Sequence, residues 1–235
     1  MDPTTTQTQH ADFGALSDTS LSRGSDALIR AKYQFESSGF AVVEDHQLGL
    51  SHEFSLAVTE ALALENQGTY LASINHSELV FVEDGKSRID SGQIIHTLAN
   101  TAEMREIAAM FGGMPQTLWH VTMNIAKKGE HHPTHRDWRA TNPIWLSLIR
   151  QSHYDGPPVL QVRDKTSGEW TAVDASGDKW VVLDAFTDHR VTTLPAARRS
   201  FVISYAPEQE SLRDIRSQDF RWREDIVPPL EDLRA

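Results

Sequence analysis

The stretch that decides the fold runs from residue 179 to residue 206 and reads KWVVLDAFTDHRVTTLPAARRSFVISYA. It contains three runs rich in β-branched and aromatic residues, KWVVLDAF, HRVTTL and RSFVISYA, and this composition is typical of β-strands. Breaks with polar residues or proline separate the runs, as turns do in consecutive strands. This part of the chain is therefore expected to be all-β.

Four further runs of the same character precede this stretch, beginning after Pro115: LWHVTMNIA, NPIWLSLI, PVLQVRD and EWTAVD. The segments KKGE, YDGPP, KTSG and ASGD carry turn residues between the runs. Seven or so short strands joined by such turns indicate an antiparallel sandwich or barrel.

The N-terminal half has a different character. Apolar residues recur at helical spacing over residues 25–37, 53–64 and 98–111, and a short apolar run at 40–43 predicts a buried strand after Gly39. Residues 1–24 are polar and aperiodic, which indicates a flexible arm. We expect a single domain over residues 25–235, with helical support at about 25–113, a β core at about 115–206 and a charged tail at 207–235.

Composition narrows the class of partner. The chain has 235 residues with 33 acidic and 22 basic side chains, a formal net charge of -11. Because nucleic-acid binding draws its affinity from Lys and Arg on phosphates, we expect no nucleic-acid partner. No apolar run approaches the ~20 residues that span a bilayer, so no membrane association is expected. The N-terminus has neither a basic start nor an apolar core, so we expect no secretory signal, and cytoplasmic is the default location.

A metal site is indicated by His135 and Asp137, which share one face of a strand because side chains alternate. His189 stands 54 residues later and opens another strand. Two histidines and one carboxylate on one face leave coordination positions open, which is the arrangement of non-haem Fe(II) oxygenases. The chain has no cysteine, so a thiolate zinc site is excluded. With eleven histidines, a chance His-x-Asp pair is the alternative.

Paired arginines, Arg198 and Arg199, follow His189 by nine and ten positions, and Ser200 comes next. A guanidinium binds a carboxylate through a planar fork, and a nearby hydroxyl adds a hydrogen bond. Because an arginine buried without an anion is unfavourable, an inward arginine here predicts an anionic ligand.

These motifs, taken in order, resemble those of the Fe(II)/2-oxoglutarate-dependent dioxygenases, which have a double-stranded β-helix, or jelly-roll and cupin-like, core. The resemblance rests on His135-x-Asp137, His189 and Arg198-x-Ser200. The segment HRVTTLP, which begins at His189, is also similar to the sequence that usually follows the second histidine ligand in this family. The segment NIAKKGEHHPTHRD also resembles Asn-x-Tyr-x-x-Gly…His-x-Asp of the alkylation-repair branch. Asn124 fits that pattern as a cosubstrate contact, whereas Ala126 stands in place of the tyrosine.

The resemblance implies a mainly β fold with N-terminal helices and an enzyme that uses Fe(II), 2-oxoglutarate and O2. His135, Asp137 and His189 would bind the metal, and the 2-oxoglutarate 5-carboxylate would lie on Arg198 or Arg199 with Ser200. The intact Asp137 argues for hydroxylation, because related halogenases carry a small residue at this position.

The substrate implied is small, such as a free amino acid or a natural-product intermediate, because the chain is similar to compact stand-alone members. Candidate substrate contacts are His132, Trp138, Arg139, Arg88 and Trp222. Two alternatives remain: the same chemistry on a peptide, protein side chain or carrier-bound substrate, and a jelly-roll protein that binds without catalysis.

Strand phase decides between the two arginines, because neighbours in a strand point to opposite faces. Arg198 is favoured, since it shares a face with Ser200. Phe201, Ile203 and Tyr205 would then pack outward against the helices. The opposite phase, with Arg199 inward, gives a more apolar interior and stays open.

Overall fold

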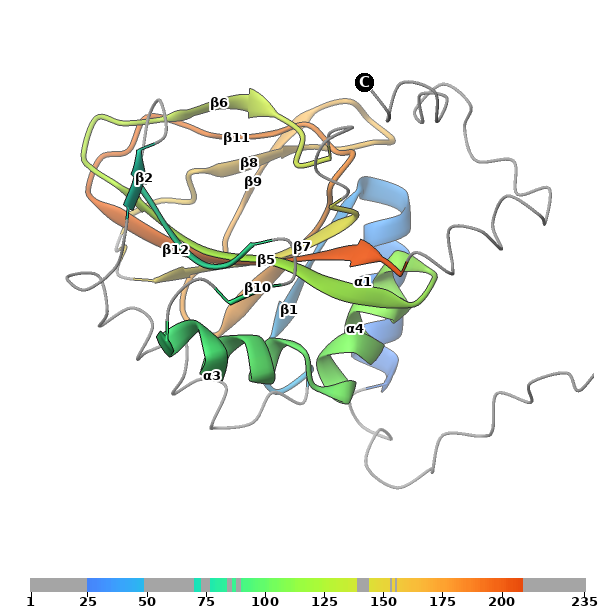
Figure 1. Cartoon of the computed structure of the whole chain (residues 1–235). Coiled ribbons are helices and arrows are strands. Elements are labelled where there is room, and N and C mark those ends of the chain that lie inside the picture. The colour runs from blue at the N-terminus through green and yellow to red at the C-terminus, as the bar shows by residue number, and fades with distance from the viewer. Residues whose placement is uncertain are drawn as a thin grey trace, which may run out of the picture.

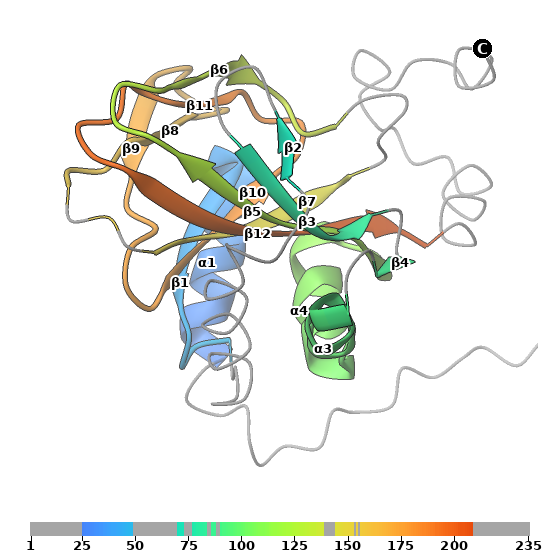
Figure 2. The same cartoon turned by 60° about the vertical axis from the view of Figure 1, so that its left-hand side comes forward.

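The computed structural model describes residues 25–48, 70–72, 77–83, 86–87, 90–138, 144–152, 154 and 156–208. Two antiparallel sheets form two layers, and helices cover the outer face of the larger sheet (Figures 1 and 2). The small sheet lies on the opposite side of the large one from the helices (Figure 1). This arrangement confirms the expected double-stranded β-helix core with N-terminal helices.

The large sheet has eight strands, and every pair within it is antiparallel. Its order is β1-β10-β7-β12-β5-β3-β2, with β4 paired to β3. The strands are β1 (Phe40–Glu44), β2 (Tyr70–Ala72), β3 (Ser77–Glu83), β4 (Lys86–Ser87), β5 (Gln116–Ala126), β7 (Leu146–Ser152), β10 (Lys179–Asp184) and β12 (Arg198–Pro207).

The small sheet has four strands in the order β6-β11-β8-β9. They are β6 (His132–His135), β8 (Leu160–Arg163), β9 (Trp170–Val173) and β11 (His189–Val191). All seven strands predicted after Pro115 are present, since each predicted run overlaps one of β5 and β7 to β12.

The N-terminal elements are α1 (Ser25–Ser38), α3 (Asp90–Ala99) and α4 (Ala102–Gly112). The predicted helix at 25–37 and strand at 40–43 are confirmed. Gly39 separates them at φ +82°, where a side chain would also meet the Thr187 hydroxyl at 2.3 Å. The prediction of one continuous helix over 98–111 was wrong. The chain there forms the end of α3 and the separate helix α4, because the Thr101 side chain accepts a hydrogen bond from the Met104 N–H and caps α4.

Strands β2, β3 and β4 were not predicted, and β3 extends the large sheet beyond β5. The predicted helix at 53–64, the arm at 1–24 and most of the tail at 207–235 lie outside the described residues. Among the helices that the structure describes, none is long and apolar enough to cross a membrane.

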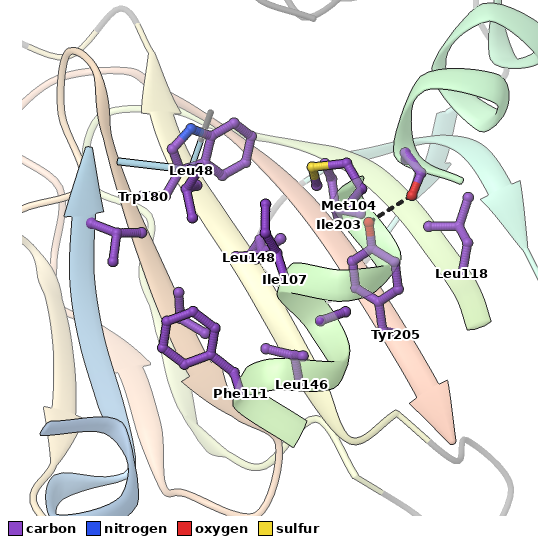
Figure 3. Packing of buried hydrophobic residues seen from close by; sticks show 14 of the residues in the cluster. Leu48, Met104, Ile107, Phe111, Leu118, Leu146, Leu148, Trp180, Ile203 and Tyr205 are labelled. Atoms are coloured by element: carbon purple, nitrogen blue, oxygen red, sulfur yellow. Dashed lines mark hydrogen bonds between the residues drawn. The ribbon is translucent and has the colours of Figure 1, made fainter. Parts of the chain in front are cut away.

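The main hydrophobic core lies between the large sheet and the helices. Figure 3 shows its centre, where Met104, Ile107 and Phe111 of α4 pack against side chains of β5, β7, β10 and β12. The Tyr205 hydroxyl donates a hydrogen bond to the Ala99 carbonyl at 2.7 Å, joining β12 to the end of α3. Phe201, Ile203 and Tyr205 belong to this core, so β12 has the phase that turns Arg198 and Ser200 the other way.

The opposite face of the large sheet looks toward the small sheet and carries several buried polar side chains. On β12 these are Arg198, Ser200 and Ser204, and on β7 they are Ser147 and Gln151. A smaller apolar cluster, which includes Ile149, Leu160, Val162 and Val181, fills the space beside them. The interior between the sheets therefore combines an apolar part with a polar part, and the polar part holds the candidate site.

Candidate metal centre and anion pocket

The candidate metal ligands come together at one edge of the small sheet. His135 ends β6 and His189 begins β11, and the two residues are direct partners in the antiparallel pairing. Asp137 lies just beyond β6, at a bend and not within the strand as predicted. One ligand atom from each of the three side chains lies within 4.8 Å of the others. The sequence therefore identified a convergent cluster, although the strand ends two residues early.

Hydrogen bonds orient both imidazoles. The Nδ1 atom of His135 lies 2.9 Å from the Pro133 carbonyl oxygen, and that of His189 lies 3.1 Å from the Thr187 carbonyl oxygen. Because a carbonyl can only accept, Nδ1 carries the proton in each ring and Nε2 of the neutral ring keeps its lone pair. The Nε2 atoms face Asp137 Oδ1 at 3.6 and 3.4 Å. Metal-binding histidines are held in the same way by an outer hydrogen bond.

Asp137 is held as a carboxylate. Burial on its own would raise its pKa, but the charges of His189 and His135 in their protonated forms and a hydrogen bond from Ser147 together hold the pKa well below its usual range. The Ser147 hydroxyl donates to Oδ2 at 2.8 Å and lies 3.0 Å from the Ser204 hydroxyl. Burial lowers the pKa of His189 and the Asp137 charge raises it, with a net rise. The donor set of two imidazoles and one carboxylate fits a divalent metal that accepts nitrogen and oxygen ligands.

An ion pair on the outer side ties the two ligand strands together. Arg136 lies between the ligands His135 and Asp137, and its Nε donates to Asp188 Oδ1 at 2.6 Å. Asp188 directly precedes His189, and Arg163 Nη1 lies 3.6 Å from its other oxygen. The Arg136 guanidinium bond raises the pKa of Arg136 and lowers that of Asp188. Because successive side chains point to opposite sides, the metal ligands His135, Asp137 and His189 point inward, and the Arg136–Asp188 ion pair points outward.

A pocket adjoins the metal ligands and contains three of the four predicted cosubstrate residues, Arg198, Ser200 and Asn124. It is lined by Asn124, Ala126, His131, His132, Val191, Leu194, Arg198 and Ser200. None of these lining residues is acidic. The ring of His132 meets that of His135 edge-on with centroids 4.0 Å apart, so the pocket borders the metal cluster.

Arg198 gives the pocket a buried positive charge. Its side chain is 6% exposed, and its Nε donates to Gln151 Oε1 at 2.9 Å. Burial lowers the pKa of Arg198 to about 10, so the guanidinium stays protonated near neutral pH. Within the described part of the chain no carboxylate forms an ion pair with Arg198. Asn124 Oδ1 is also buried and has no hydrogen-bond partner there. A buried cation without a carboxylate partner fits an anionic ligand, whereas Asn124 Oδ1 is an acceptor and requires a donor.

The structure separates the predicted site residues into four groups. The triad, Arg198, Ser200, Asn124 and His132 lie around the cluster and the pocket. Arg199 points to the other face of β12 and is absent from the pocket lining. Trp138, which directly follows Asp137 in the sequence, stacks on Phe186 with ring centroids 5.3 Å apart. Arg88, Arg139 and Trp222 lie outside the described residues.

Sequence reasoning missed Ser147 and Gln151. Both lie on β7, four residues apart, and therefore share a face with Ile149. Ser147 contacts Asp137 and Gln151 contacts Arg198. Two polar residues at even spacing within the run LSLIRQS were the available signal.

Solved structures with the same fold are found by comparison, although no family model and no curated protein matches the sequence. One is a 2OG-Fe(II) oxygenase family oxidoreductase from Burkholderia pseudomallei, with TM-score 0.63, 16% identity, and coverage of 76% of this chain and 89% of that one. Another is a prolyl hydroxylase from Trichoplax adhaerens in complex with a hypoxia inducible factor peptide, with TM-score 0.61, 15% identity, and coverage of 84% and 96%.

A third is SnoN, a non-heme alpha ketoglutarate dependent epimerase from nogalamycin biosynthesis, with TM-score 0.60, 14% identity, and coverage of 78% and 82%. At these identities the likeness establishes the fold. The chain thus has the double-stranded β-helix fold that these 2-oxoglutarate and iron oxygenases share.

Proposed function

Starting from this shared fold, we propose that the protein is an Fe(II)/2-oxoglutarate-dependent oxygenase. The observation that carries the proposal is the position of two different sites in one interior. The His135, Asp137 and His189 cluster suits a divalent metal, and it borders a pocket whose buried Arg198 has no carboxylate partner in the described chain. A metal alone would not require the arginine, and an anion alone would not require the triad.

The residues present fit both the metal and the cosubstrate. His135, Asp137 and His189 would hold Fe(II), and Arg198 with Ser200 would hold the 5-carboxylate of 2-oxoglutarate. Fe(II) together with 2-oxoglutarate and O2 supplies the oxidising power for a substrate C–H bond, with succinate and CO2 as co-products. Asn124 is a further cosubstrate contact, because it lines the pocket and its side-chain Nδ2 can donate a hydrogen bond.

The chain's own contribution is orientation and exclusion of water. Carbonyl groups hold the two imidazoles with Nε2 inward, and Ser147 fixes the Asp137 carboxylate. Val191 and Leu194 supply apolar walls to the pocket. In such an environment the attraction between Arg198 and a carboxylate is stronger than in water.

A small molecule such as a free amino acid or a natural-product intermediate is the proposed substrate, and hydroxylation the proposed outcome. Asp137 supports an oxygen-transferring outcome, since it fills the position that a halide would need. His132 and Trp138 remain candidate substrate contacts, because the His132 ring packs against that of His135 and Trp138 directly follows Asp137. The likeness to a peptide-bound prolyl hydroxylase keeps a peptide substrate as the second candidate.

The first test separates an enzyme from a binding protein. Under anaerobic conditions, addition of Fe(II) and 2-oxoglutarate should produce the weak visible charge-transfer absorption of the chelate. A protein that binds ligands without this chemistry would give no such band. Succinate release is then screened against free amino acids and against candidate peptides, and the class that stimulates release identifies the substrate.

A further inference from the structure

Within the described chain, the only hydrogen bond that the buried Arg198 side chain makes is donated to a neutral residue. Gln151 is 4% exposed, and its Oε1 accepts from Arg198 Nε at 2.9 Å. A guanidinium has five N–H donors, and this contact uses the one on Nε. The two terminal nitrogens therefore remain available to form an end-on fork with a ligand carboxylate.

The position of Gln151 is fixed by strand pairing. Gln151 lies opposite Ser200 in the pairing of β7 with β12, and Ser200 lies opposite Asn124 in the pairing of β12 with β5. These three polar residues thus form one row across the sheet, beside Arg198. The Gln151 backbone N–H also donates to the Ala175 carbonyl at 2.7 Å. The acceptor that meets Arg198 is therefore held by the sheet and by the segment before β10.

Three other arginines in the fold, Arg136, Arg150 and Arg163, contact carboxylates. Arg150, next to Gln151 in sequence, makes two bonds of 2.9 Å from Nη1 to the carboxylate of Asp45. Arg136 and Arg163 both contact Asp188. Arg198 is the more buried cation, yet its partner is an amide, which orients the guanidinium without cancelling its charge. The uncancelled charge is an advantage only if a ligand anion compensates it.

We propose that Gln151 is a positioning residue that orients Arg198 while leaving its charge uncompensated, and that this neutrality makes the pocket select a 2-oxo acid with a distal carboxylate. The proposal rests on the proposed function and extends it from the anchoring arginine to the residue that sets the charge of the pocket. A carboxylate at position 151 would compete with the ligand, because it would pair with Arg198 internally.

The test compares two ligands and needs no turnover. The wild-type chain and the Gln151→Glu variant are loaded with Mn(II), and binding of 2-oxoglutarate and of 2-oxopentanoate is measured by calorimetry. 2-Oxopentanoate has the same carbon chain and metal-chelating end but a methyl group in place of the distal carboxylate. The wild type should prefer 2-oxoglutarate. Gln151→Glu should lose affinity for 2-oxoglutarate on the order of 100-fold while its affinity for 2-oxopentanoate changes little.

A second variant tests orientation separately from charge. Gln151→Leu removes the acceptor and adds no charge, so 2-oxoglutarate affinity should fall by about tenfold, as expected for a lost hydrogen bond to a charged group. 2-Oxopentanoate should again be affected little. This variant also decides the matter if Gln151→Glu does not fold, which a thermal unfolding scan reports.

The chain offers a matched control outside the pocket. Arg190 Nε donates to Gln161 Oε1 at 2.8 Å, so Gln161→Glu makes the same chemical change in a pair that does not line the pocket. Both affinities should stay at wild-type values. Equal loss in Gln161→Glu and Gln151→Glu would overturn the proposal, because the effect would then be a general one of added charge.

The outcomes distinguish this proposal from the one on which it rests. Wild-type protein that binds 2-oxoglutarate, together with variants that keep the preference for it, contradicts the role of Gln151 alone. Wild-type protein that binds neither oxo acid when loaded with metal contradicts the proposed function and this proposal with it. Loss of 2-oxoglutarate affinity confined to the Gln151 variants supports both.

Discussion

The hydroxyl of Ser147 donates to Asp137 Oδ2 at 2.8 Å, while Oδ1 of the same carboxylate faces the Nε2 atoms of His135 and His189. The two oxygens therefore have different roles. Oδ2 is held by the large sheet, and Oδ1 is turned toward the space between the imidazoles. The contact also joins the two sheets, because Ser147 belongs to β7 and Asp137 follows β6.

The first prediction follows from this contact. Ser147→Ala should weaken divalent metal binding by about 10- to 100-fold, the usual loss when an outer partner of a ligand is removed. Competition between the protein and a chelator for Mn(II) measures the change. Ser204→Ala is the control, because the Ser204 hydroxyl lies 3.0 Å from that of Ser147, whereas the hydrogen bond to Asp137 comes from Ser147, so its effect should be smaller. Equal metal affinity in wild type and Ser147→Ala would show that the hydrogen bond does not orient the ligand.

The second prediction concerns the triad. His135→Ala, Asp137→Ala and His189→Ala should each abolish metal-dependent succinate formation, because each removes one of three convergent ligand atoms. Asp137→Gly should lose hydroxylation and keep weak iron binding. Succinate assays and thermal unfolding scans measure turnover and folding together. His46→Ala serves as control, since its imidazole is 70% exposed and contacts Glu44. A single triad variant with near wild-type turnover would show that this residue is no ligand.

Strand content and motif order could be predicted from sequence, because turn residues and β-branched runs report on local structure. The alternation along β12 also predicted which side chains face the helices. The end of β6 before Asp137 could not be predicted, because strand ends depend on pairing with β11. Ser147 and Gln151 were missed because β7 is covered on both faces, so polarity at one position does not reveal what it contacts.

The third prediction distinguishes the paired arginines. Arg198 lines the pocket and is buried, whereas Arg199 lies on the opposite face of β12. Losing a charged contact with a buried carboxylate costs roughly 2 to 5 kcal/mol, so Arg198→Met should raise the KM for 2-oxoglutarate by on the order of tenfold to a thousandfold. Arg199→Met should change it little. Steady-state kinetics with varied 2-oxoglutarate makes the comparison, and the reverse pattern would identify Arg199 as the anchor.

The fourth prediction concerns how the ionised Asp174 side chain, in the turn before β10, makes the stability of the fold depend on pH. Lys179 and Ser176 hydrogen-bond to Asp174 and lower its pKa to about 2. Because the folded pKa lies below the unfolded one, this stabilisation is complete above about pH 4 and is lost as the pH falls through 2. Asp174→Asn should therefore be less stable than wild type near pH 7, by about 1 kcal/mol or less since both side chains are 39% exposed.

Urea unfolding of the wild type and of Asp174→Asn at several pH values measures this difference. The gap in unfolding free energy should close as the pH approaches 2. A gap that stays constant over the whole range would mean that the carboxylate charge contributes nothing at this turn.

The last prediction compares two buried tyrosines, one whose hydroxyl has a hydrogen-bond partner among the described residues and one whose hydroxyl has none there. The Tyr154 hydroxyl is buried and has no hydrogen-bond partner among the described residues, whereas the Tyr205 hydroxyl donates to the Ala99 carbonyl at 2.7 Å. A buried polar group without a partner destabilises the fold, while a satisfied hydrogen bond contributes about 1 kcal/mol. Tyr154→Phe should therefore leave the free energy of unfolding unchanged or raise it by up to about 1 kcal/mol, and Tyr205→Phe should lower it by about 1 kcal/mol or more. Because both substitutions remove the same single atom from a buried ring, urea unfolding of the two variants isolates the hydrogen bond from packing. A comparable loss in both would mean that the Tyr154 hydroxyl has a partner after all.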